Sequence, residues 1–161
     1  MPLYRDTLVV VDMQPDLSAS RPDWLRRSVR CLIDKARADN MAVVVLEYLS
    51  QEPLRYYGNT YEDLIAAARG QAHFAMRAKA DPDGSARVAD ALTSMAIVSE
   101  RFVVCGVNTH ACVEATATGL SRRYPASRIE VAANACNDFR GNDWSVFAQT
   151  ANLTVNHHTQ D

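Results

Sequence analysis

Short apolar segments alternate along the chain with segments of helical periodicity. The apolar segments are rich in valine and lack polar alternation, which is typical of strands buried on both faces of a parallel sheet. The predicted strands are Thr7–Asp12, Ala42–Leu49, His73–Lys79, Phe102–Val107, Arg128–Ala133 and Leu153–Val155. The predicted helices are Pro22–Asn40, Thr60–Arg69, Ser85–Met95, Ala111–Tyr124 and Asp143–Ala151.

This alternation predicts an α/β fold, a three-layer α/β/α Rossmann-like domain with a mostly parallel sheet of about five or six strands. The sequence has no internal repeat, low-complexity stretch or linker, so we expect one domain over residues 1–161. Ligands of such sheets bind at the carboxyl ends of the strands. The residues that directly follow each strand are therefore the first candidates for a functional site.

The charge and composition of the chain limit the classes of partner that it is expected to bind. The formal net charge is -2 and no block of like charge stands out, which argues against a nucleic-acid or membrane partner. We find no signal-peptide pattern and no apolar stretch of membrane-spanning length. The four cysteines lack the tight spacing of a disulfide scaffold or a C-x-x-C site. Free thiols favour a cytoplasmic location.

Three reactive side chains fall at predicted strand ends. Asp12 ends the first strand, Lys79 ends the third, and Cys112 opens the helix after the fourth. A cysteine near a helix N-terminus is favoured as thiolate, and a nearby lysine would lower its pKa further. A carboxylate could accept the thiol proton. The expectation is one fast-reacting thiol of low pKa.

Each of these residues also has a structural explanation when it is taken alone. Cys112 could be a small buried apolar residue, Asp12 a cap for a neighbouring loop, and Lys79 a solvated side chain. The basic residues number 17, and only Lys35 and Lys79 among them are lysines, the type whose pKa proteins can tune. The joint placement at strand ends favours a catalytic group.

Two sequence blocks resemble a known family. VVVDMQPDL is similar to the opening motif of isochorismatase-like cysteine hydrolases, and VVCGVNTHACVEATATGL is similar to their cysteine signature. The separation of 33 residues from Lys79 to Cys112 also suits this family. The resemblance extends from Thr7 to about Asn137 and implies the strand order 3-2-1-4-5-6.

The resemblance also implies the roles of the site residues. Cys112 would be the nucleophile, Asp12 its general base, and Lys79 the cation that tunes both. A cis peptide bond is implied between Val107 and Asn108. The backbone N–H groups of Asn108 and Cys112 would then form an oxyanion hole.

The chain departs from the family pattern at several positions. Metal-dependent nicotinamidases carry Asp-x-His after the second strand, where this chain reads Leu46-Glu47-Tyr48-Leu49-Ser50. We therefore expect no metal and no cofactor. Isochorismatases proper lack the cysteine, which disfavours vinyl-ether hydrolysis. Asn134 stands where many relatives have aspartate.

Three further residues are predicted to bind substrate. Leu17 stands where relatives often have an aromatic residue that lines the pocket, and Tyr48 lies on a segment that could overhang the strand ends. His110 lies in the turn before Cys112, although it could instead face solvent or a subunit interface. The chain is shorter than most relatives, so we expect a pocket that is either trimmed or completed by a neighbouring subunit, and we expect a homo-oligomer.

The predicted function is a cysteine-dependent amidohydrolase that cleaves an amide, carbamoyl or ureido C–N bond of a small molecule through a thioester. One alternative is a catalytically silent protein that uses the same fold for binding or assembly. Another is a thiol redox enzyme in which Cys136 approaches Cys112 in space.

Overall fold

A mostly parallel sheet forms the centre of the computed structural model, which describes residues 1–51 and 54–157. Within these residues, its parallel strands follow the order β5 (Phe74–Lys79), β3 (Ala42–Gln51), β2 (Thr7–Val11), β7 (Arg101–Val107), β8 (Arg128–Asn137) and β9 (Leu153–Asn156). This arrangement confirms the predicted strand order. A short strand, β4 (Leu54–Tyr56), pairs antiparallel with the end of β3.

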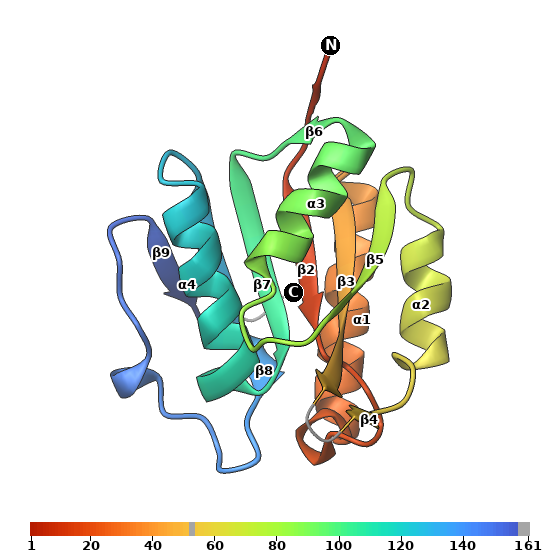
Figure 1. Cartoon of the computed structure of the whole chain (residues 1–161), viewed down its shortest axis with the longest axis vertical. Coiled ribbons are helices and arrows are strands. Elements are labelled where there is room, and N and C mark those ends of the chain that lie inside the picture. Colours follow the sequence, from red (N-terminus) through yellow and green to blue (C-terminus); the bar gives the residue numbers. More distant parts are fainter. Residues whose placement is uncertain (52–53, 158–161) are drawn as a thin grey trace.

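Helices cover both faces of the sheet (Figure 1). On one face α1 (Asp23–Ala38) and α2 (Glu62–Arg69) pack on one apolar cluster, and on the other α3 (Ser85–Met95) and α4 (Glu114–Arg123) pack on a second. Strand β2 supplies both clusters, because Val9 and Val11 face α3 and α4 while Leu8 and Val10 face α1 and α2. The three-layer α/β/α prediction is confirmed.

Several local predictions differ from the structure. The predicted loop 50–59 contains the end of β3 and β4, and its residues 52 and 53 lie outside the described residues. Strand β8 continues to Asn137, past the predicted end at Ala133. A small parallel pair, β1 (Leu3–Tyr4) with β6 (Ile97–Val98), was not predicted. These elements are short or irregular, and apolar periodicity carries little signal for them.

The predicted helix Asp143–Ala151 is wrong. Only Trp144–Val146 form a single 3₁₀ turn, η3. The Asp143 carboxylate accepts the N–H of Ser145, and Glu114 Oε2 accepts the N–H of Ala148 at 2.7 Å. Side chains that bind backbone N–H groups in this way offer the segment an alternative to helical hydrogen bonds.

The four cysteines are all free, and Cys105 and Cys136 are fully buried in the sheet. Within the described residues, we find no helix that combines the length and the apolar character needed to cross a membrane.

Gly106 lets two central strands approach closely beside the carboxyl end of β2. Its φ is +117°, and a Cβ built on it would lie 2.1 Å from the carbonyl oxygen of Val11. Val11 and Gly106 are partners in the β2–β7 register, directly before Asp12 on one strand and the Asn108 turn on the other. Gly106 therefore fixes the spacing between these two functional segments.

We predict that Gly106→Ala lowers the free energy of unfolding by more than about 3 kcal/mol, since it combines an unfavourable φ with overlap against backbone. Gly141→Ala is the matched control, because Gly141 also has positive φ, +84°, but no atom lies within 4 Å of its built Cβ. It should cost only about 1 kcal/mol. Urea denaturation measures both, and equal losses would contradict the role of close approach.

Candidate active site

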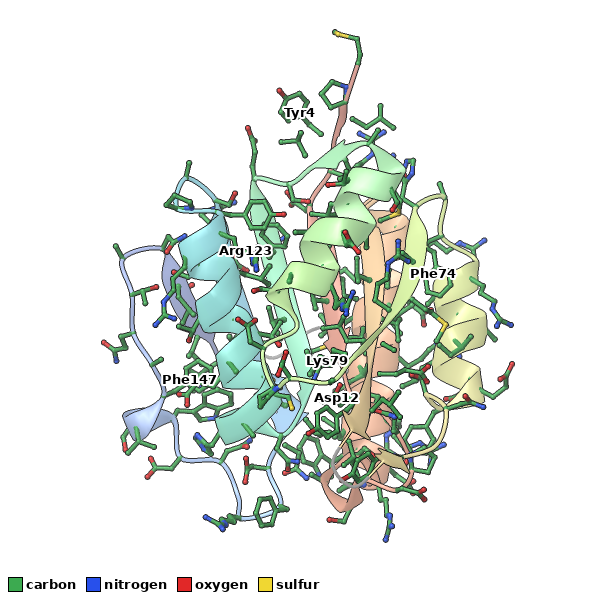
Figure 2. The ribbon with its side chains drawn as sticks, viewed as in Figure 1. Tyr4, Asp12, Phe74, Lys79, Arg123 and Phe147 are labelled. Atoms are coloured by element: carbon green, nitrogen blue, oxygen red, sulfur yellow. The ribbon has the colours of Figure 1, made fainter. Side chains whose placement is uncertain are left out.

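A buried ion pair lies at the carboxyl edge of the sheet. Lys79 ends β5 and Asp12 follows β2, so the two side chains meet across the end of the intervening strand β3. Lys79 Nζ donates to Asp12 Oδ2 at 3.0 Å and to the Asp81 carbonyl at 3.2 Å. Both side chains are 1% exposed, and Figure 2 shows them close together at this edge. The Cys112 thiol interacts with both of these side chains, so the structure brings the three predicted catalytic residues together.

The second carboxylate oxygen of Asp12, Oδ1, differs from Oδ2 in its hydrogen bonding. Oδ1 is buried and has no hydrogen-bond partner among the described residues. Asp12 also has a positive φ of 53°, a conformation that aspartate tolerates better than most residues. One oxygen of the carboxylate is therefore held by Lys79, and the Cys112 thiol is the other side chain that interacts with the carboxylate.

Gly84 leaves space for the Lys79 side chain, and Thr116 holds the turn that contains Gly84. A Cβ built on Gly84 would lie 2.9 Å from Lys79 Cδ and 2.5 Å from Leu46 Cδ1. Thr116 on α4 fixes this turn, because its Oγ1 accepts the Gly84 N–H at 3.0 Å and donates to the Pro82 carbonyl at 3.3 Å. Thr116 lies within the cysteine signature, and sequence reasoning assigned it no role.

Cys112 lies in the turn that follows β7. The Val107–Asn108 peptide bond is cis, as the family resemblance predicted. Residues Thr109–Val113 then form one π-helical turn, η2, that leads into α4, and Cys112 is half-buried within it. The Asn108 carbonyl accepts the N–H groups of Ala111 and Val113, each at 3.1 Å.

The end of β8 braces this turn. Asp138, 6% exposed, accepts the His110 N–H at 2.9 Å, and the Asn108 side chain accepts the Phe139 N–H at 2.9 Å. Sequence reasoning missed Asp138 because it placed the end of the strand at Ala133. An aspartate next to a strand end was the available signal.

The electrostatics of Cys112 differ from the sequence prediction. Burial, followed by the negative charge of Asp12, raises the pKa of the Cys112 thiol to about 12, and Lys79 only partly opposes this. The expectation of a low thiol pKa at a helix N-terminus is therefore wrong, because the turn is too poorly solvated for a thiolate at rest. Burial also raises the pKa of Asp12, against the lowering effect of Lys79.

The predicted substrate-binding residues have different surroundings. Tyr48 is half-buried, and Lys79 Nζ lies 4.7 Å from its ring centroid. His110 Nε2 accepts the Asp143 N–H at 2.8 Å, and its ring packs near Trp144 and Phe147. Leu17 packs against the apolar cluster under α1 and α2. Tyr48 thus adjoins the ion pair, and substrate contact stays a prediction for all three residues.

Within residues 1–51 and 54–157, the side chains form no metal site. Glu47 Oε2 already accepts the N–H and the hydroxyl of Thr60, at 2.6 and 3.0 Å. No group of three or more His, Cys, Asp or Glu side chains within the described part of the chain could hold a metal ion.

Family comparison agrees with this geometry. The sequence matches the Isochorismatase domain family over residues 6–158. The chain belongs to this family. The resemblance drawn from the two motifs is thereby confirmed, and no curated protein matches the chain in sequence.

Solved structures of the isochorismatase fold are similar at low identity. The nicotinamidase SaPncA from Staphylococcus aureus is 19% identical with a TM-score of 0.76, and the match covers 96% of this chain and 98% of that one. The MAR1 ribonuclease from Caenorhabditis elegans is 20% identical with a TM-score of 0.67, over 86% and 67% of the two chains. The YcaC gene product from Escherichia coli, described as an octameric hydrolase of unknown specificity, is 21% identical with a TM-score of 0.64, over 84% and 65%. These likenesses support the fold.

The buried ion pair of Lys79 and Asp12 leads to a prediction about the stability of the protein. Lys79→Met leaves a buried carboxylate, and Asp12→Asn leaves a buried ammonium, so each should lower the free energy of unfolding by about 3–5 kcal/mol. The double variant should lose clearly less than the sum of the two single losses, because it leaves no unpaired charge.

The control is Lys35→Met, which breaks the exposed pair of Lys35 and Asp39, 60% and 48% exposed. It should change stability by less than about 1 kcal/mol. Additive losses for the double variant in urea unfolding would show that Asp12 and Lys79 are not energetically paired.

Proposed function

We propose that the protein is a cysteine-dependent hydrolase of amide-type C–N bonds in small molecules, with Asp12, Lys79 and Cys112 as its catalytic group. The observation that carries this proposal is the Asp12 carboxylate, which is held by Lys79 through Oδ2 and has a buried, unpartnered Oδ1. Asp12 interacts with the Cys112 thiol, and each affects the other's pKa. A carboxylate in this state is suited to accept the thiol proton.

The reaction begins with proton transfer. The thiol pKa of about 12 means that Cys112 is protonated at rest, so Asp12 accepts the proton as sulfur attacks the carbonyl carbon. The raised pKa of Asp12 favours this transfer, since it makes the carboxylate a stronger base. Lys79 stabilises the negative charge that passes between the two groups.

The later steps reuse the same groups. The backbone N–H groups of Asn108 and Cys112 stabilise the oxyanion, an effect of about 3 kcal/mol per donor in comparable sites. Protonated Asp12 then donates its proton to the leaving nitrogen, and the C–N bond breaks to give a thioester and ammonia or an amine. Water attacks the thioester, Asp12 accepts a proton from the water, and the proton returns to sulfur as the carboxylic acid leaves.

The comparisons support the class of reaction. SaPncA is described as a nicotinamidase, and E. coli YcaC is described as a hydrolase of unknown specificity. The octamer reported for YcaC also supports our proposal that this chain forms a homo-oligomer. A small carboxamide, carbamoyl or ureido compound is accordingly the proposed substrate class.

Ammonia release tests the function. We expect wild-type protein to release ammonia from at least one member of a panel of carboxamides, carbamates and ureas. Cys112→Ala should reduce the rate by at least about 10³-fold, since the nucleophile is lost. Cys31→Ala is the control, because Cys31 is an exposed residue of helix α1. A panel with no turnover by wild type would favour the alternative of a catalytically silent binding or assembly protein.

Thiol alkylation separates the roles of the two charges. Asp12 raises and Lys79 lowers the thiol pKa, so Asp12→Asn should speed alkylation of Cys112 by iodoacetamide and Lys79→Ala should slow it. We expect about 10-fold or more at pH 8 in each direction, because one neighbouring charge shifts a pKa by about 1–3 units. The wild-type rate should keep rising with pH up to pH 10, without a plateau.

Lys35→Ala is the control for alkylation and should leave the rate unchanged. Asp12→Asn should abolish ammonia release even though its thiol reacts faster, since no acid remains to protonate the leaving nitrogen. Asp12→Asn and Lys79→Ala should therefore change the alkylation rate of Cys112 in opposite directions. Slower alkylation in both would contradict the proposed charge arrangement.

A further inference from the structure

The Lys79 ammonium has an aromatic neighbour in addition to its hydrogen-bond acceptors. Nζ lies 4.7 Å from the centroid of the Tyr48 ring, within the range of about 6 Å for a cation–π contact. The lysine side chain is 1% exposed, and such contacts are strongest where the cation is desolvated. The ring therefore forms one wall of the space that the ammonium occupies.

The charged and titratable groups near this ammonium come from several elements. Asp12 follows β2, Glu47 lies on β3 and acts electrostatically on Asp12, and Cys112 lies in the η2 turn. The Asp81 carbonyl accepts from Nζ in the turn after β5. The face of the Tyr48 ring adds an attraction for the cation to the hydrogen bonds that Nζ donates.

Sheet register places the ring over the lysine. Tyr48 is the partner of Lys79 in the parallel β3–β5 ladder, and paired residues project their side chains to the same face of a sheet. Strand β2 ends at Val11, which pairs with Leu46. The Tyr48 backbone therefore extends beyond the end of β2. Its N–H and carbonyl groups need another hydrogen-bond partner on the side that faces β2.

The side chain of Gln14 supplies that partner. Gln14 is fully buried; its Oε1 accepts the Tyr48 N–H at 2.8 Å, and its Nε2 donates to the Tyr48 carbonyl at 3.2 Å and to the Gly58 carbonyl at 2.8 Å. The amide thus takes the place of a strand backbone. A second ring, that of Tyr57, contacts Tyr48 with 5.5 Å between centroids.

We infer that Tyr48 is a positioning residue for Lys79: the face of its ring holds the ammonium against Asp12, beside Cys112, and its hydroxyl group is not required. The inference rests on the proposed function for its catalytic meaning. The placement of the cation itself does not depend on any substrate. Gln14 and the β3–β5 register fix the ring in this position.

The test is the alkylation rate of Cys112 by iodoacetamide, measured from pH 7 to pH 10 on the Cys112 peptide, so that exposed Cys31 does not interfere. Tyr48→Leu should slow alkylation by about 3- to 30-fold, because a displaced ammonium no longer favours the thiolate. Tyr48→Phe should keep the wild-type rate. Tyr57→Leu, which removes the ring that contacts Tyr48, should change the rate by less than about 2-fold.

A double-mutant cycle shows whether Tyr48 acts through Lys79. In the Lys79→Ala background, Tyr48→Leu should have no further effect on the alkylation rate. An equal slowing in both backgrounds, a loss with Tyr48→Phe as large as with Tyr48→Leu, or faster alkylation in Tyr48→Leu would each overturn the inference. The assay needs no substrate, so a protein that fails every ammonia-release test still decides this point.

Discussion

The ion pair between Lys79 and Asp12 is the interaction on which the candidate site depends. Two opposite charges, each 1% exposed, meet at 3.0 Å at the carboxyl edge of the sheet. Removing either one leaves a buried charge without a partner, which is far more costly than removing both. The surrounding features serve this pair: Gly84 leaves room for the lysine chain, and the β3–β5 register places Tyr48 over the ammonium.

The pair also determines what the thiol can do. An isolated buried cysteine is an inert apolar residue, and the pKa of about 12 for Cys112 indicates a protonated resting state. Under the proposed function, Asp12 acts as the base because its own desolvation raises its pKa, while the charge of Lys79 opposes that rise. Reactivity in this account arises during attack on the carbonyl group, and it does not require a thiolate that exists beforehand.

Much of this arrangement could be predicted from the sequence. Asp12 and Cys112 follow valine-rich strands and Lys79 ends a third strand, and parallel strands bring their carboxyl ends to one edge. The direction of the thiol pKa could not be predicted, because a helix N-terminus and a nearby lysine favour the thiolate while burial opposes it, and sequence does not give the depth of burial. Asp138 and Gln14 were not assigned roles because their partners are backbone groups far along the chain. The 143–151 segment has helical apolar spacing, but the side chains of Asp143 and Glu114 bind its backbone instead.

The central claim is that Cys112 forms a covalent acyl intermediate with the carbonyl group of an amide. It is tested most directly by intact-protein mass spectrometry on samples quenched in acid during turnover of whichever amide releases ammonia. The account predicts a mass increase equal to the acyl group, located on the Cys112 peptide, that is absent in Cys112→Ala. Ammonia release by Cys112→Ala at the wild-type rate, with no adduct in either protein, would contradict it.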